Sequence, residues 1–464
     1  MELWNHQHEA VEWAAGRAWA LLHHGMGSGK TKTTLALILR CIAERQATRM
    51  LVCCPKAVMP AWRKQVGLWC PDIRVVLLDG KTKRTKEKQL AAAFADQSPV
   101  IVVVNYESAW RLDEIEKQSW DVLVWDEVHR LKAPSGSASR WAGRMTKKNP
   151  HARRYGLTGT LIPHSILDVW AIYRSLEAPA CTTFGTSYTM HRAKYAVMNP
   201  HQQGMVIAWR NLPEAHRKIA ATTHHVRSSD VLDLPPIQFI DEPVEMTAGE
   251  ARLYREVERE FCAVCESGAV TPKNALEQLL RLQQICGGYV RFDDEATARQ
   301  ISDGNPAKAQ RLADMMEDSP SAEPFVIFCR FSSDIAAVKA AANAVGRSVS
   351  ELSGARNQLA EWQAGDTDVL VAQIQSGGIG IDLTRAAYGV FYSLGYSLAE
   401  YEQAVARLHR PGQERRTTIY HLTATANGRA TVDGRVYEAL RERKEVVNAI
   451  IDGYRGRPAP AGTR

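Results

Sequence analysis

The chain has 464 residues, 45% of them apolar and 23% charged, and a formal charge of +7 at pH 7. This length allows two or three folded domains, the composition excludes a disordered or fibrous protein, and the modest positive charge is compatible with a polyanionic partner. Nine scattered cysteines favour a reducing compartment, and with neither a signal-peptide pattern nor an apolar run of about 20 residues we expect a cytoplasmic protein without a membrane segment.

Residues 3–13 form the first predicted element, an amphipathic helix. Gln7 lies within it, and its amide offers both a donor and an acceptor, which is what the edge of an adenine base requires. The alternative is a surface helix in which this glutamine has no special role.

A glycine-rich loop follows the short apolar run 18–22 and precedes the helical pattern 33–42. Between a strand and a helix, such a loop wraps a polyphosphate with backbone N–H groups and the positive helix end. Lys30 is then expected to reach the β- and γ-phosphates, and the Thr31 hydroxyl to bind Mg²⁺. The first glycine of the full phosphate-loop pattern is replaced by His24, so a glycine-rich loop that binds nothing stays an alternative.

Two strands and a basic run come next. Residues 50–54 are continuously apolar and end at a proline, as in a buried parallel strand, so Cys53 and Cys54 are predicted to be core thiols on opposite faces. Residues 81–88 are basic, which indicates a solvated helix face or a nucleic-acid contact. Residues 100–104 form the next predicted strand.

Residues 121–125 form an apolar strand that ends in Asp126 and Glu127, the expected companion of a phosphate loop. Asp126 can hold the water shell of Mg²⁺, and Glu127 can orient or deprotonate an attacking water. Together with the loop, this acidic pair predicts hydrolysis of a nucleotide.

The basic segment 140–154 leads into 155–160, where small residues at a strand end allow close backbone approach. Strands alternate with helices throughout this first part, which predicts a doubly wound parallel sheet. From 171 to 233 the alternation fades into a helical insertion. His216, His224 and His225 are there, but no ligand spacing supports a metal site.

The prolines at 235 and 236 mark a predicted domain boundary. Helices are predicted at 247–268 and 272–285, and the Cys262/Cys265 pair has no second pair that would complete a zinc site. Strands return at 325–328, 369–372 and 388–392, forming a second α/β lobe without a phosphate loop. There Arg407 and Arg410 are expected on one helical face, either as arginine fingers for a γ-phosphate or as surface residues.

With these blocks in this order, residues 3–454 resemble the Swi/Snf-like DNA translocases of helicase superfamily two. The resemblance rests on Gln7, the loop 26–31, the Asp-Glu-x-His box at 126–129, Thr158-Gly159-Thr160, the segment 233–236, the helix 279–286, the glycine-rich 377–383, the arginine helix 403–413 with its Gly412-Gln413 ending, and the closing helix 432–451.

The resemblance implies two RecA-like doubly wound parallel-sheet lobes in tandem, with helical protrusions and a C-terminal brace helix. The implied divisions are 1–172 for the first lobe, 173–235 for its protrusion, 236–300 for a linker and the second protrusion, 301–430 for the second lobe, and 431–464 for the brace and tail.

The resemblance also implies ATP and Mg²⁺ as cofactors. The implied catalytic residues are Lys30, Asp126, Glu127, Arg407 and Arg410, and Mg²⁺ is assigned to Thr31 and Asp126. The nucleotide-binding set is Gln7, Met26, Gly27, Ser28, Gly29, Lys30, Thr31, Gly380, Asp382 and Gln403. Candidate DNA contacts are Lys56, Tyr106, Lys132, Ser376 and the stretch 140–154.

Three features depart from the family pattern. His24 and Gly25 replace an acidic pair, Leu161 replaces a proline, and Ser228 and Asp230 occupy a stretch that is usually basic. The build without reader domains favours a phage or bacterial motor.

The function that the resemblance implies is an ATP-dependent translocase on double-stranded DNA, largely independent of sequence and acting as a monomer in the host cytoplasm, with an unknown protein partner left open. A strand-separating helicase and an ATP-gated DNA clamp are the alternatives.

Overall fold

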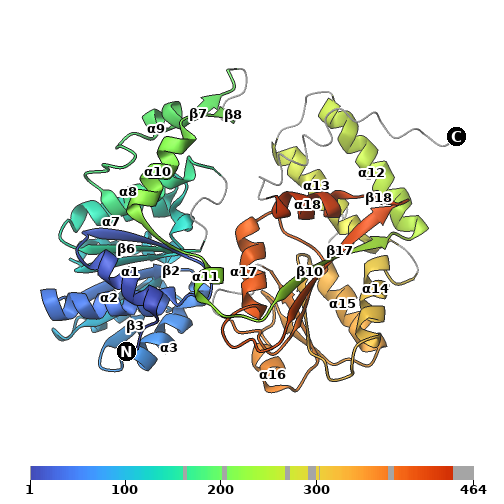
Figure 1. Ribbon diagram of the computed structural model, residues 1–464, viewed down its shortest axis with the longest axis horizontal. Coiled ribbons are helices and arrows are strands. Elements are labelled where there is room, and N and C mark those ends of the chain that lie inside the picture. Colours follow the sequence, from blue (N-terminus) through green and yellow to red (C-terminus); the bar gives the residue numbers. More distant parts are fainter. Residues whose placement is uncertain are drawn as a thin grey trace. The chain divides into compact units, whose positions relative to one another are not determined.

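The chain folds into two α/β units that divide between Asp233 and Leu234 (Figure 1). The computed structural model describes residues 2–159, 165–200, 206–266, 272–290, 299–301, 304–374 and 381–442. The predicted fold class, two parallel-sheet α/β lobes, is confirmed. Among the described helices, none combines the length and the apolar character that a membrane span requires.

The first unit is built on a seven-stranded parallel sheet in the order β3-β4-β2-β5-β6-β1-β9. Its strands are β1 (Trp19–His24), β2 (Arg49–Cys54), β3 (Arg74–Leu77), β4 (Val100–Asn105), β5 (Val122–Asp126), β6 (Arg153–Thr158) and β9 (Thr223–Val226). Continuously apolar strands such as β4, buried along its whole length, need cover on both faces.

Three sets of packed helices belong to this unit. Helix α2 (Lys30–Arg45) packs between α1 (Asn5–Ala15) and α3 (Met59–Trp69). Helix α4 (Lys83–Ala93) packs against α6 (Asp113–Lys117). Helix α7 (Ser137–Lys148) packs against both α5 (Tyr106–Ala109) and α8 (Asp168–Glu177). Short 3₁₀ turns follow β2 (η1, Lys56–Val58) and β5 (η2, Val128–Leu131). Cys53 and Cys54 are both fully buried on successive positions of β2, so their prediction as core thiols is confirmed.

An insertion follows α8. It contains α9 (Tyr188–Tyr195), the antiparallel pair β7 (Ala196–Met198) and β8 (Val206–Trp209), and α10 (Leu212–Thr222). The chain then returns to the sheet as β9 and ends the unit with α11 (Ser228–Val231). The predicted protrusion 173–235 is therefore too long, because β9 hydrogen-bonds to β1 inside the first lobe.

The second unit has a six-stranded parallel sheet in the order β10-β17-β16-β13-β15-β14, with β18 antiparallel to β17. The strands are β10 (Ile237–Glu245), β13 (Phe325–Cys329), β14 (Val349–Leu352), β15 (Val369–Gln373), β16 (Tyr388–Phe391), β17 (Thr417–Ala426) and β18 (Arg429–Ala430). We predicted 236–300 as a linker and the second protrusion; the backbone of residues 237–245 instead pairs along nine positions with β17 and forms an edge strand.

The helices of this unit are α12 (Ala248–Glu266), α13 (Pro272–Cys286), α14 (Ala307–Glu317), α15 (Ser332–Ala344), α16 (Leu359–Ala364), α17 (Leu398–Leu408) and α18 (Val432–Arg441), with a small antiparallel pair β11 (Tyr289–Val290) and β12 (Arg299–Gln300). Helix α18 is the described part of the predicted brace helix. Its continuation at 443–451 lies outside the described residues.

Candidate nucleotide site

The predicted nucleotide residues of the first unit converge on one edge of its sheet. The glycine-rich loop follows β1, Asp126 ends β5, and Thr158 ends β6, the strand between them. Because these strands are parallel, their carboxyl ends meet at the same edge, where open α/β sheets bind ligands. Thr160 and Leu161 lie outside the described residues.

The loop itself is shorter than predicted. Strand β1 continues through His24, so the loop comprises Gly25 to Gly29 before α2 begins at Lys30. Gly27 and Gly29 have φ values of +78° and +80°, in the left-handed region that glycine adopts without strain. These two residues therefore allow the backbone to curl back on itself just before the helix.

Side chains of helix α1 form hydrogen bonds with backbone carbonyls of this loop. His6 Nε2 lies 2.8 Å from the Ser28 carbonyl oxygen, and Gln7 Nε2 donates to the carbonyls of Ser28 and Gly29 at 3.2 and 3.3 Å. A carbonyl only accepts, so His6 carries its proton on Nε2 in this contact. The Gly25 and Ser28 N–H groups also donate within the protein, to the Val226 and Gly25 carbonyls at 2.7 and 3.4 Å, so an anion would be bound by the other N–H groups of the loop.

The structure corrects the expected surroundings of Gln7. Its side chain is 1% exposed, its Nε2 is bound to the loop, and its Oε1 accepts from the Trp4 N–H at 3.0 Å. Both ends of the amide that we assigned to an adenine edge thus serve the fold. Sequence reasoning missed the partnership with His6, for which the only signal is proximity along the helix.

Lys30 spans the base of the loop. Its Nζ donates to the carbonyls of His24 and Gly25 at 3.0 and 3.3 Å, and Ser28 Oγ donates to Gly25 at 2.7 Å. The ammonium group is therefore held where the loop leaves β1. Thr31 is half-buried in the first turn of α2.

The acidic pair is deeply buried. Asp126 and Glu127 are 6% and 5% exposed. Trp62 Nε1 donates to Asp126 Oδ2 at 2.8 Å, and the Tyr106 hydroxyl donates to the Asp126 carbonyl at 2.8 Å. Burial, followed by the neighbouring Glu127 charge, raises the pKa of Asp126 to about 6, while Trp62 and Lys30 oppose this rise. A divalent cation would favour the ionised carboxylate, so this donor suits Mg²⁺.

Glu127 has an unusual backbone. Its φ of +53° lies in the left-handed region, which costs a non-glycine residue of order 1–3 kcal/mol and is found at functional sites. His129 Nδ1 lies 3.3 Å from Glu127 Oε2 and 3.2 Å from Thr158 Oγ1. His129 therefore lies between the acidic pair and the end of β6.

The candidate DNA contacts are not all on the surface. Lys56 is exposed in η1, and Lys132 is half-buried, with its pKa lowered by burial. Tyr106 is 3% exposed and its hydroxyl is bound to Asp126, so the prediction that it contacts DNA is wrong. Ser376 lies outside the described residues.

The basic stretch 140–154 also divides. Arg144 pairs with Glu116 through two nitrogens at 3.1 Å, and Arg154 is buried with its guanidinium on the Ala18 carbonyl. Arg154 lies near the start of β6, at the sheet edge opposite the glycine-rich loop. Of the candidate stretch, Arg154 is therefore not available to DNA, whereas Arg140 and Lys147 are exposed on α7.

In the second unit, Gln403 and Arg407 lie half-buried on α17. The helix ends at Leu408, so Arg410 does not share its face as predicted; its Nη1 donates to the Ile381 carbonyl at 3.0 Å. Asp382 is exposed and accepts from Thr384, whereas Gly380 lies outside the described residues.

Gln413, in the Gly412-Gln413 pair that follows α17, has a structural role. Its Nε2 lies within hydrogen-bond distance of the carbonyls of Thr384, Ala386 and Leu408, at 3.2, 2.9 and 3.2 Å, and the residue is 5% exposed. The buried amide ties the segment after α17 to the turn before β16.

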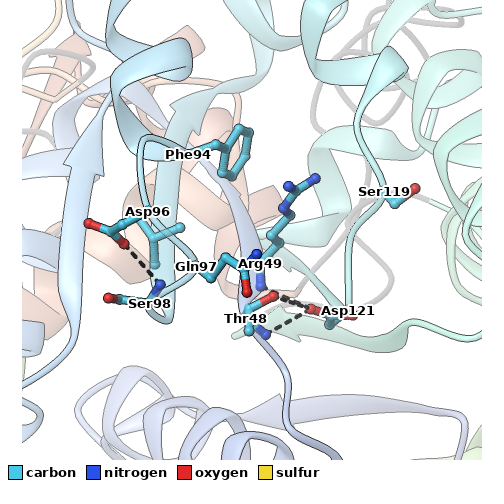
Figure 2. A pocket seen from close by; sticks show the side chains of 9 residues that line it. Thr48, Arg49, Phe94, Asp96, Gln97, Ser98, Ser119 and Asp121 are labelled. Atoms are coloured by element: carbon cyan, nitrogen blue, oxygen red, sulfur yellow. Dashed lines mark hydrogen bonds between the residues drawn. The ribbon is translucent and has the colours of Figure 1, made fainter.

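A cavity of about 310 Å³ lies elsewhere in the first unit (Figure 2). It is next to the amino ends of β2 and β4, opposite the glycine-rich loop. Asp121 accepts from the N–H groups of Thr48 and Arg49 at 2.8 and 2.9 Å, and the Arg49 guanidinium lies 4.6 Å from the centre of the Phe94 ring. These polar groups bind one another, and the cavity is separate from the nucleotide residues.

No three histidine, cysteine, aspartate or glutamate side chains form a metal-binding group in the described parts of either unit. His224 and His225 instead contact His24 and His23 across neighbouring strands, at 2.9 and 3.0 Å.

Comparison with known proteins gives two family matches. Residues 6–288 match the SNF2-related domain, and residues 307–412 match the helicase conserved C-terminal domain. Among solved structures, the chain is similar to the Sulfolobus solfataricus SWI2/SNF2 ATPase core in complex with dsDNA. The aligned region covers 98% of this chain and 94% of that one, at 20% identity and a TM-score of 0.45.

Two relatives differ greatly in length. A putative ATP-dependent helicase/translocase of Bacillus subtilis, YwqA, is 23% identical over 443 residues, which cover 93% of this chain and 46% of that protein. Putative protein p41 of Acyrthosiphon pisum secondary endosymbiont phage 1 is 24% identical over 455 residues, covering 93% of this chain and 94% of the phage protein. The chain thus spans less than half of the Bacillus protein and nearly all of the phage protein.

The first family match covers more than half of the chain and contains the glycine-rich loop and the acidic pair, and the second contains α17 together with Arg407 and Arg410. The chain therefore belongs to the SNF2-related family, with a helicase C-terminal domain following its SNF2-related domain.

Proposed function

We propose that this protein is an ATP-hydrolysing motor that translocates along double-stranded DNA. The observation that carries the proposal is the convergence, at one sheet edge, of Lys30 and its glycine-rich loop with the buried pair Asp126 and Glu127. A loop that binds polyphosphate and an acid that activates water are together the parts that nucleotide hydrolysis requires. The names of the relatives, an ATP-dependent helicase/translocase among them, support the same activity.

In this mechanism the loop N–H groups and Lys30 bind the ATP phosphates. Asp126 and Thr31 would hold Mg²⁺, which supplies positive charge against the phosphate oxygens. Glu127 accepts a hydrogen bond from the attacking water and takes its proton, with His129 beside its carboxylate. Arg407 and Arg410 of the second unit are the proposed arginine fingers, which would neutralise charge on the transferred phosphoryl group.

Movement on DNA would follow from closing and opening of the two units during each cycle of hydrolysis. Lys56 and the exposed Arg140 and Lys147 are the remaining described candidates for phosphate contacts. Contacts of this kind carry little sequence information, and their affinity falls steeply with salt.

The first test measures ATP hydrolysis at fixed salt without nucleic acid and with double-stranded DNA, single-stranded DNA or RNA. We expect strong stimulation by duplex DNA and almost no hydrolysis by Lys30→Ala. Hydrolysis by Lys30→Ala within about threefold of the unsubstituted rate would contradict the assigned site.

A second test separates translocation from strand separation. The expected result is displacement of a third, triplex-forming strand without unwinding of an annealed duplex. Unwinding of the duplex would identify a helicase, and nucleotide-dependent DNA affinity without stimulated turnover would identify a clamp.

A further inference from the structure

The end of the first unit lies directly against the glycine-rich loop. Strand β9 pairs with β1, with His24 opposite Val226, and the Gly25 N–H donates to the Val226 carbonyl at 2.7 Å. Two residues later, Ser228 Oγ donates to the Met26 carbonyl at 2.7 Å. One short segment therefore binds two successive residues of the loop.

Gly25 is what permits this approach. A Cβ atom at Gly25 would lie 2.2 Å from Ser228 Oγ and 2.7 Å from the Ser228 backbone nitrogen, distances that no real contact shows. The backbone nitrogen cannot move as the end of a flexible side chain would. The absence of a side chain at Gly25 and the hydroxyl at Ser228 are thus parts of one contact.

Paired imidazoles hold the same two strands together. His24 Nε2 lies 2.9 Å from His224 Nδ1, and His23 Nδ1 lies 3.0 Å from His225 Nδ1. His23 Nε2 is also 3.2 Å from the Gly159 carbonyl, which can only accept. A neutral His23 therefore carries its proton on Nε2, and its Nδ1 accepts from His225.

We propose that Ser228 is a positioning residue for ATP binding, acting through the Met26 carbonyl of the loop. The proposal rests on the proposed function of that loop as the ATP phosphate site. A carbonyl oxygen turned toward the phosphates would place negative charge against them, and the Ser228 hydroxyl holds the Met26 oxygen in a hydrogen bond instead. His6 and Gln7 hold the Ser28 carbonyl in the same way from α1.

The consequence is that the loop is held from two sides. One side is helix α1 at the start of the unit, and the other is the segment from β9 to Ser228, which runs on to the boundary at Asp233. Removing the Ser228 hydroxyl should weaken phosphate binding and leave the acidic pair intact, because Asp126 and Glu127 have other partners.

The experiment compares Ser228→Ala, Ser228→Thr and Ser319→Ala in the full chain. Ser319 is the matched control, since its Oγ also donates to a carbonyl, that of Met315, at 2.7 Å in the second unit. The Kd of a non-hydrolysable ATP analogue, KM and kcat for ATP, and the melting temperature are measured for each. Ser228→Ala should raise Kd and KM by about threefold to tenfold, as the loss of one hydrogen bond implies, with kcat within about twofold.

The threonine variant keeps a hydroxyl and should restore most of the affinity, and Ser319→Ala should bind the analogue as the unsubstituted protein does. Unchanged Kd in Ser228→Ala, or an equal loss in the Ser319→Ala control, would overturn the positioning role. Full hydrolysis by Lys30→Ala would instead overturn the proposed function of the loop. Gly25→Ala is a second probe, for which we expect a larger loss of affinity because the segment must shift.

Discussion

At the scale of single residues, the nucleotide loop depends on side chains whose polar groups bind backbone atoms. Gln7 uses its amide on the backbone of Trp4, Ser28 and Gly29, and the Tyr106 hydroxyl is bound to the Asp126 carbonyl. Removing one partner of a buried hydrogen bond leaves the other unsatisfied, at about 1–3 kcal/mol. Such residues can therefore affect catalysis without touching ATP.

Gln7→Ala separates loop support from base recognition. If the amide supports the loop, affinity falls about equally for ATP and GTP, because the loop binds the phosphates that both share. If it reads the adenine, affinity falls for ATP alone. From the contacts of Gln7 we expect the equal loss, measured as Kd for both nucleotides, with the exposed His8→Ala as the control on the same helix.

Glu127→Gln changes the chemistry of one group while keeping its shape. We expect ATP affinity close to that of the unsubstituted protein and loss of turnover, because an amide cannot take a proton from water. Single-turnover hydrolysis and analogue binding measure the two effects separately. Loss of nucleotide affinity would show that Glu127 has a structural role instead.

At the scale of helices and strands, a buried ion pair joins two helices of the second unit. Lys308 on α14 is 1% exposed and its Nζ contacts Asp433 on α18 as well as the Tyr392 carbonyl at 2.9 Å. The described start of the brace helix is thus fixed to the helix that precedes β13. A buried charge that loses its partner is costly, typically about 3–5 kcal/mol.

Asp433→Ala should therefore lower the free energy of unfolding of the second unit by about 3–5 kcal/mol. The double variant Lys308→Met/Asp433→Leu should be less costly, because it leaves no unpaired charge in the interior. Urea unfolding of the three proteins gives the comparison. A single substitution that costs less than the double one would contradict this account.

At the scale of the whole molecule, burial changes the titration of both units. It lowers the pKa of His23, His191 and His421 to about 4 and that of His24 to about 3. In the unfolded chain these histidines take up protons below about pH 6.5, so each one makes the folded state less stable as the pH falls from 6.5 toward 4.

Two buried carboxyls act in the opposite direction. Burial is the main cause that raises the pKa of Asp126 and of Asp334 to about 6, so the folded protein keeps these protons where the unfolded chain has lost them. The contribution of these two carboxyls to the stability of the folded state therefore grows as the pH falls from 6 to about 3.8. Four histidines with shifts of this size outweigh two carboxyls.

The net expectation is a loss of stability between pH 6.5 and 4, and little change from these groups above pH 6.5. Urea midpoints at pH 7.5, 6 and 5 measure it. His421→Gln, which cannot take up a proton, should reduce the slope of the second unit. A protein that grows more stable between pH 6.5 and 5 would show that the carboxyls dominate.

The sequence by itself indicated the two parallel-sheet lobes, the glycine-rich loop, the acidic pair and the family, but not the pairing of β9 and β10 with their sheets. Each of these features depends on residues that are neighbours in the sequence: apolar strands of five or six residues, glycines where φ is positive, and an acidic pair at the end of an apolar run. Neighbouring residues carry this information, so it can be read without knowing what the chain touches.

Only the tertiary structure decided what lies against the loop. Val226 and Ser228 are about two hundred residues from Gly25 and Met26, and their contact exists because β9 pairs with β1. The burial of Tyr106 and Arg154, and the end of α17 before Arg410, likewise depend on packing and on distant carbonyls. The type of a polar residue indicates which groups it can bind, but the fold determines which group lies next to it.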